Sequence, residues 1–400
     1  MSFIHLVEPQ RQPVQWPILA LGFRPFFLLA ALFSAAAIPL WILIYEGILD
    51  PVSHLPPTIW HGHEMVFGFV VAVIAGFLLT ASSHWTGWQT ASGWRLGLLA
   101  GLWIAGRIAM TAGSHFPAWL AVGLDVAFLP VVAVGLAIPI LRVGNRRNIA
   151  FPIILLVLAA TNMAVHLAAL GVIDWDPARG LRVAIDLILL MIGVLGGLVI
   201  PSFTKNALPH VRVDPCAKAS ALALLSLAAL AISEAAIGTP GVTGSLALLA
   251  GAVNAVRMRG WGSLGTAHHP ILWILHVGYA WLAIGLILRG IGDLTGIIPI
   301  DAGIHALTLG AIGSMTIGMM SRVALGHTGR SISPARLTIV AYWLVNAAAA
   351  LRVAFAFIPD DPFRTASLTA SGALWSMAFL CFALVYLPIL GRPRVDGRPG

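Results

Sequence analysis

WHGHEMVFGFVVAVIAGFLLTA, residues 60–81, is a long apolar run that carries two histidines and a glutamate near its start. A helix of about 20 residues, rising about 1.5 Å per residue, crosses the roughly 30 Å hydrocarbon layer of a bilayer. The run therefore predicts a membrane-spanning helix. Ionisable side chains are costly in such a helix, so His61, His63 and Glu64 need a functional explanation.

Similar apolar runs recur along the whole chain. Of its 400 residues, 59% are hydrophobic and 10% are charged, whereas soluble domains average about a quarter charged. With short connections between the runs, we predict an all-α polytopic membrane protein, one domain over residues 1–400, with a bundle of about 12 transmembrane helices. The predicted spans are 25–45, 63–83, 94–112, 117–141, 149–171, 181–202, 218–238, 242–257, 270–290, 302–322, 337–358 and 369–391.

The basic residues predict the orientation of the bundle. If the N-terminus is cytoplasmic, 17 of the 23 lysines and arginines fall on the inner side and four on the outer side, as positive-inside insertion requires. Both termini are then cytoplasmic, as a segment at 1–24 and a tail at 392–400. Because the net charge of +8 is spread over these loops rather than gathered in one patch, we expect a lipid bilayer and no nucleic acid as partner.

Most ionisable residues within the predicted spans fall in their outer halves. Such groups usually face the bundle interior or a wet cavity, which suggests a functional pocket near the outer face. The alternative for each is an ion pair or hydrogen bond between helices, and for the two arginines the choice lies between haem propionates and pairing with Asp125 or Asp186. The residues are Glu64, Arg107, Asp125, Asp186, Glu234, Arg352, His63, His166 and His305.

The histidines divide by direction and depth. His61 and His63, two residues apart on a helix, point about 200° apart and cannot bind one metal together. His61 and Glu64, at i and i+3, share a face, as an imidazole ligand and its supporting carboxylate often do. His276 is predicted near the inner side, about 15 Å in depth from His305, so these two should not share one iron.

Two further histidines are each compatible with more than one role. His166 follows Asn162 by one turn, which is compatible with metal ligation or with an Asn–His hydrogen bond between helices. His327 lies on the predicted inner side with His84. These two residues are candidates for a second site there. Three methionines of the stretch 304–330 are either thioether ligands of copper or packing residues: Met315, Met319 and Met320.

Several segments together resemble one known family. WHGHEMVFGFVVAVIAGFLLTA (60–81), FRPFF (23–27), GGLVIPSFTKN (196–206), LHVGYAW (275–281) and HALTLGAIGSMTIGMMSRVALGHTGR (305–330) resemble the NnrS family of bacterial membrane proteins over nearly the whole chain. The resemblance implies a twelve-span protein of the bacterial inner membrane that carries non-covalent haem b, with copper as a further candidate. It also implies a role in the response to nitric oxide, in nitrosative stress and denitrification.

The sequence thus predicts an inner-membrane haem protein that binds nitric oxide and reduces it to N2O, as a nitric oxide reductase-like oxidoreductase, at an outer haem or haem–copper site. We expect His63 or His305 at the haem, His61 and His166 at copper, and a quinol or redox protein as electron donor. The alternatives are a non-catalytic haem protein that binds or senses nitric oxide, and a twelve-span transporter. The candidate residues are, for catalysis, Glu64, Asp125 and Asp186; for cofactor binding, His63, His305, His276, Arg107 and Arg352; and for metal, His61, His63, His166, His305 and His327.

Overall fold

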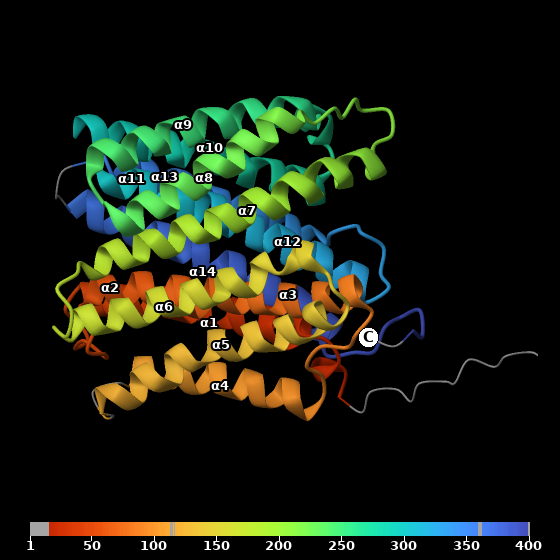
Figure 1. Cartoon of the computed structure of the whole chain (residues 1–400), viewed down its shortest axis with the longest axis horizontal. Coiled ribbons are helices and arrows are strands. Elements are labelled where there is room, and N and C mark those ends of the chain that lie inside the picture. The colour runs from red at the N-terminus through yellow and green to blue at the C-terminus, as the bar shows by residue number, and fades with distance from the viewer. Residues whose placement is uncertain (1–15, 113–114, 116, 359–361, 399–400) are drawn as a thin grey trace, which may run out of the picture.

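The computed structural model describes residues 16–112, 115, 117–358 and 362–398. Within this part of the chain the regular structure is helical, and no strand is formed. Residues 1–15 and 399–400 of the expected cytoplasmic termini lie outside the described residues. Figure 1 shows the long helices side by side, with their connections gathered at the two ends of the bundle.

Twelve continuous helices make up the described bundle, and two of them contain a π-helical segment in mid-course. In chain order they are α1 (Phe23–Tyr45), α2 (Pro57–His63) with η2 (Glu64–Val70) and α3 (Val71–Thr86), α4 (Trp94–Thr111), α5 (Ala118–Arg142), α6 (Ala150–Ala169), α7 (Pro177–Ala207), α8 (Ala217–Ala236), α9 (Pro240–Met258), α10 (Pro270–Thr295), α11 (Ile300–His305) with η7 (Ala306–Gly313) and α12 (Ser314–His327), α13 (Arg336–Phe355) and α14 (Pro362–Leu390).

The predicted count of helices is confirmed. Eleven of the twelve are long and apolar enough to cross a membrane; the twelfth, α4, has 18 residues and is not among them. Two arginines and three glycines lower its apolar content, yet it packs lengthwise against α5 (Figure 1). The chain is therefore a polytopic membrane protein with eleven candidate spans, beside which α4 packs.

The largest boundary difference that affects a candidate site lies at the second helix. It begins at Pro57, whereas residue 63 was the predicted start. Proline is favoured in the first turn because its missing N–H is not needed there. As a result His61 and His63 stand inside a helix with fixed directions.

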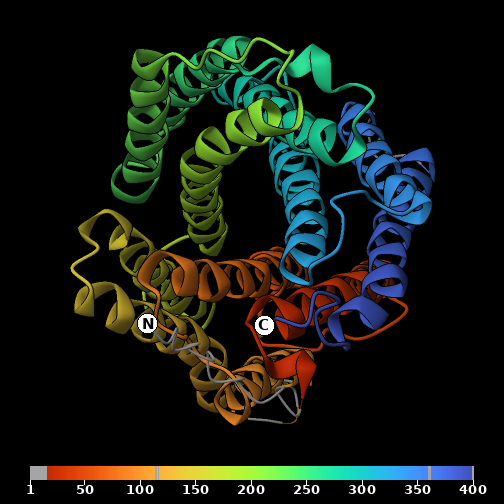
Figure 2. The ribbon, with the colours of Figure 1, turned by 90° about the vertical axis from the view of Figure 1, so that its right-hand side faces the viewer.

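Seen along the helices, the bundle forms a ring whose first and last members meet (Figure 2). Helices α1 and α14 pack together, and Arg24 Nη1 donates hydrogen bonds to the carbonyl oxygens of Leu390 and Arg392, both at 2.7 Å. Arg24, the last residue before the predicted first span, is part of α1 and fully buried. Its charge is stabilised by carbonyls at the end of the last helix.

A partly open pocket of about 80 Å³ lies between α1, α3, α7 and the η7–α12 helix. Its lining is almost wholly aliphatic, aromatic or methionine, and it extends from Val70 and Ile312, in the two π segments, toward Leu78 and Met319. Met315 and Met319, considered either as copper ligands or as packing residues, both line it. The middle of the ring is therefore an apolar space.

The tightest contact between neighbouring helices depends on small residues. A Cβ atom added at Gly290 of α10 would lie 2.7 Å from Leu248 N and 2.8 Å from Gly244 O, both backbone atoms of α9. The two backbones can approach this closely only without a side chain between them.

We expect Gly290→Ala to force α9 and α10 apart and to lower the free energy of unfolding by about 1–3 kcal/mol, the usual cost of overpacking. Gly101→Ala is the matched control, because a Cβ at Gly101 on α4 meets nothing within 4 Å. Thermal unfolding of the two purified variants measures the difference. Equal melting temperatures would contradict the tight contact.

Candidate functional site

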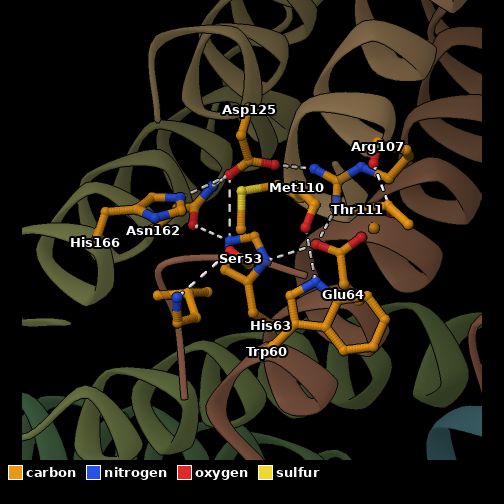
Figure 3. A network of polar contacts seen from close by, with 12 residues as sticks. Ser53, Trp60, His63, Glu64, Arg107, Met110, Thr111, Asp125, Asn162 and His166 are labelled. Carbon is orange, nitrogen blue, oxygen red and sulfur yellow. Dashed lines mark hydrogen bonds and ion pairs between the residues drawn. The ribbon is translucent and has the colours of Figure 1, made fainter. Parts of the chain in front are cut away.

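Six buried polar side chains from four helices meet near the end of the bundle predicted to face outside. We call them the outer polar cluster (Figure 3). None is more than 6% exposed, and each helix contributes part of the set. Its members are His63 from α2, Glu64 from η2, Arg107 from α4, Asp125 from α5, and Asn162 and His166 from α6.

Arg107 binds both carboxylates of the cluster. Its Nη1 donates to Glu64 Oε1 at 2.7 Å, and its Nη2 contacts Asp125 Oδ1. The predicted alternative in which Arg107 pairs with Asp125 is the one observed. Because Arg107 lies on α4, this ion pair also explains how α4 is fixed to the bundle.

His63 lies between the two carboxylates. Its Nδ1 is 2.9 Å from Glu64 Oε1, and its Nε2 is 2.8 Å from Asn162 Oδ1 and 3.2 Å from Asp125 Oδ2. Asn162 Nδ2 donates to Asp125 Oδ2 at 2.6 Å. Glu64 thus supports His63. The i, i+3 spacing had favoured His61 as its partner. The difference arises because Glu64 is the first residue of the π segment that follows His63.

His166 continues the cluster toward the outer surface. Its Nε2 donates to Asp125 Oδ2 at 3.0 Å, and its Nδ1 lies 3.1 Å from Nε2 of His54. His54 is half-buried in the connection between α1 and α2. The sequence analysis missed this residue, because nothing in the spacing of a histidine in a loop shows which helix it will contact.

Burial lowers the pKa of His54 from 6.5 to about 4, and the nearby imidazoles of His166 and His63 lower it further in that direction. His54 is therefore neutral near pH 7.

A second arrangement brings together the two remaining outer histidines, which we call the outer histidine pair: His61 and His305. The ring of His61 stacks on Trp41, with centroids 4.0 Å apart, and lies within electrostatic range of His305 and Arg352. His305 Nδ1 donates to the carbonyl oxygen of Asp301 at 2.7 Å. Both rings keep some accessible surface although protein surrounds them.

The structure therefore regroups the predicted ligands. His61 and His63 diverge, as their spacing predicted, so that His63 joins His166 while His61 joins His305. The predicted copper pair of His61 and His166 is thus divided between the two arrangements. The separation follows from the helical start at Pro57, which places His61 and His63 on different faces of one helix.

Each arrangement borders a π-helical segment. One such segment, η2, follows His63 directly, and the other, η7, follows His305 directly. Wide turns of this kind are rare and occur frequently at functional sites, because they alter the direction of the side chains around them. Two of them beside two histidine groups mark this end of the bundle as the candidate site.

One comparison with known proteins decides the family. A family model described as NnrS protein matches residues 17–394. The chain belongs to the NnrS family. Its membership, together with the eleven candidate spans, identifies a multi-pass membrane protein of the nitric oxide response. A search of curated proteins found no match.

The NnrS family is generally a metal- and haem-binding family, and the outer polar cluster contains a donor set of that kind. One ligand atom each from His63, Asp125 and His166 lies within 4.8 Å of the others, all from buried residues. Two imidazoles and a carboxylate are a common set for a divalent transition metal.

Of the other candidate residues, Asp186 belongs to a separate ion network. Arg289 donates from Nη1 to Asp186 Oδ1 at 2.6 Å and from Nη2 to Glu234 Oε2 at 2.7 Å. This network joins α10 to α7 and α8. Asp186 therefore pairs with Arg289, and not with Arg107 or Arg352, the two arginines considered for it. Arg352 pairs instead with Asp301, at 3.5 Å.

The inner histidines have partners of their own. Both ring nitrogens of His276 are hydrogen-bonded to hydroxyls, those of Thr204 and Ser263, each at 2.9 Å. His327 Nδ1 lies 3.3 Å from His84 Nε2. These contacts place both residues away from the outer histidine pair and agree with the depth predicted for them.

We expect Arg107→Met to lower the free energy of unfolding by about 3–5 kcal/mol, because it leaves buried carboxylates without their cation. Arg95→Met, at an exposed position of the same helix, should cost little. Adding Glu64→Gln to Arg107→Met should recover part of the loss, which a double-mutant cycle of thermal or denaturant unfolding measures. No recovery in the double variant would argue against the pairing.

A second prediction concerns pH. The folded-state pKa of His54 is about 4 and its ordinary value 6.5, so between these values the unfolded chain binds the proton and the folded chain does not. Stability should therefore fall as the pH is lowered from about 6.5 to about 4. His54→Gln should reduce this slope in unfolding curves recorded across that range, and an unchanged slope would show that His54 does not contribute.

Proposed function

We propose that this protein binds nitric oxide at a haem b held by His305 in the outer half of the bacterial inner membrane. The main observation in support of this proposal is the hydrogen bond from His305 Nδ1 to the carbonyl oxygen of Asp301. A ring anchored at Nδ1 keeps Nε2 as its ligand atom, which is the usual preparation of an axial histidine.

The surroundings of His305 fit such a group. His61 approaches it from the other π-containing helix, with its ring held by Trp41. Haem iron with one histidine ligand has an open position that binds nitric oxide. Within this chain, His305 would bind the iron, Trp41 orients His61, and Arg352 holds Asp301 in place.

The apolar cavity supports nitric oxide as the ligand. Nitric oxide is small and uncharged, and an aliphatic interior favours such a molecule over water and ions. The cavity begins at the π segments that follow the two histidine groups. The two π segments thus stand between this apolar space and the histidines.

The outer polar cluster favours reduction of nitric oxide as a second candidate function. Formation of N2O follows 2 NO + 2 H⁺ + 2 e⁻ → N2O + H2O, so that a site for it needs protons as well as an electron donor, here a quinol or a small redox protein. Glu64 stands three residues after His61. It contacts His63, which in turn contacts Asp125, and all three are buried groups that can carry a proton. A protein that only binds or senses nitric oxide needs no such series.

An optical spectrum of the reduced, purified protein, recorded with and without nitric oxide, tests the proposal. We expect a haem spectrum that shifts with nitric oxide and is lost in His305→Ala. His276→Ala is the matched control, a buried histidine already bonded to two hydroxyls, and should keep the spectrum. Full haem content in His305→Ala would refute the assignment, and anaerobic measurement of N2O separates reduction from binding.

A further inference from the structure

Four buried hydroxyl groups gather near the end of the bundle predicted to face the cytoplasm, away from both outer histidine arrangements. They belong to Ser321 of α12, Thr338 and Tyr342 of α13, and Tyr386 of α14, and each of these residues is 0% exposed. The Ser321 hydroxyl lies close to both phenols, and the Thr338 hydroxyl lies close to that of Tyr386. We call these four residues the inner hydroxyl cluster.

Three of the four oxygens have no hydrogen-bond partner within the described part of the chain. Tyr342 Oη, Tyr386 Oη and Thr338 Oγ1 are buried without one. Ser321 differs, because its Oγ donates to the carbonyl oxygen of Ile317 at 2.7 Å. Buried polar atoms are nearly always bonded, so three unpartnered hydroxyls in one place indicate that a bound molecule or ion completes their hydrogen bonds.

Packing holds the two phenol rings in place. The ring of Tyr342 meets that of Trp273 edge-on, with centroids 5.9 Å apart, and the ring of Tyr386 stacks on Phe382 at 4.4 Å. Turning either phenol toward another partner would break these aromatic contacts. The hydroxyls are therefore directed at one another's surroundings by three different helices.

Arg322 brings a positive charge to the same place. Its guanidinium lies 3.7 Å from the centroid of the Phe203 ring on α7 and within electrostatic range of Tyr342. No carboxylate of the described residues pairs with it. Arg107 and Arg289, by contrast, each bind two carboxylates. The counter-charge of Arg322 is thus missing from the chain itself.

The unsatisfied groups of this region have the chemistry of an anion site. A guanidinium carries N–H donors and no acceptor, and each free hydroxyl has an O–H to donate. A water molecule accepts about two of these hydrogens and leaves the charge of Arg322 uncompensated. A cation would be repelled by the guanidinium. An anion accepts several hydrogen bonds at once and neutralises the charge.

We propose that the inner hydroxyl cluster and Arg322 bind a small monovalent inorganic anion, a halide or a nitrogen oxyanion. Tyr342, Tyr386 and Thr338 donate their O–H groups to it, and Arg322 supplies the positive charge. This site is separate from the outer polar cluster and from the outer histidine pair. It does not depend on the proposed binding of haem or nitric oxide.

The residues limit the class of ligand. The cluster is fully buried, which excludes large organic anions. Arg322 is the one charged residue that we assign to the site, so a single negative charge balances it, whereas a divalent anion would leave an uncompensated charge in a buried place. Hydroxyl donors also bind an anion without needing to transfer a proton to it. Sulfate is therefore the anion expected to fail.

The first experiment measures binding of radiolabelled chloride to the purified, full-length protein, with gluconate used to keep the ionic strength constant. We expect one saturable chloride per chain, displaced by bromide, nitrite or nitrate and not by sulfate. The order of displacement shows whether a halide or a nitrogen oxyanion is preferred. Absence of saturable chloride binding, together with no thermal stabilisation by bromide, nitrite or nitrate, would overturn the proposal.

Single-atom variants test the assigned donors. Tyr342→Phe and Tyr386→Phe remove one hydroxyl each and keep the ring, and each should weaken anion binding by about ten- to a hundredfold, the effect of one hydrogen bond to a charged group. Tyr45→Phe is the matched control, since that phenol belongs to a residue 46% exposed on α1, and should bind as before. Arg322→Gln should weaken binding further than Arg322→Lys. Unchanged affinity in both phenylalanine variants at the cluster would overturn the assignment.

Thermal unfolding separates binding from folding. In gluconate alone, the double variant Tyr342→Phe/Tyr386→Phe should unfold no earlier than the unaltered protein, because it removes buried hydroxyls that have no partner. Chloride should raise the melting temperature of the unaltered protein by mass action and leave that of the double variant unchanged. Equal stabilisation of both by chloride would show that the anion binds elsewhere. Neither measurement involves haem or nitric oxide, so failure of the proposed haem site would not produce these outcomes.

Discussion

A charge inside a bilayer must be neutralised by partners that the protein itself provides, and this constraint organises the bundle. Arg107 is the clearest case: its two carboxylate partners come from the helix before α4 and the helix after it. Arg289 does the same for α7, α8 and α10. Each guanidinium therefore determines which helices are neighbours and how they are rotated, in a membrane where apolar faces alone discriminate poorly between partners.

The sequence predicted the helices well because the bilayer imposes a minimum length on apolar runs. It predicted the rotation of the helices poorly. Spacing along one helix showed that His61 and His63 diverge, but their partners His305 and His166 depend on packing between segments more than 100 residues apart. Asp186 was assigned to the candidate site by depth alone, and depth does not separate two networks on different sides of a ring.

Loop residues were the least predictable part of the site. His54 has no periodic context, so only the folded connection between α1 and α2 shows that it touches His166. Arg24 presented the opposite difficulty. Its position at the edge of an apolar run resembles that of a cytoplasmic charge, whereas the folded ring buries it against the last helix.

That contact has a consequence for how the protein is made. Arg24 is among the first residues of the bundle to enter the membrane, while the carbonyls that receive its hydrogen bonds belong to residues synthesised hundreds of positions later. During synthesis the nascent chain must therefore hold an arginine in a provisional environment until α14 leaves the ribosome. Closure of the ring is a late event, and a chain released early would expose an unsatisfied cation to cellular quality control.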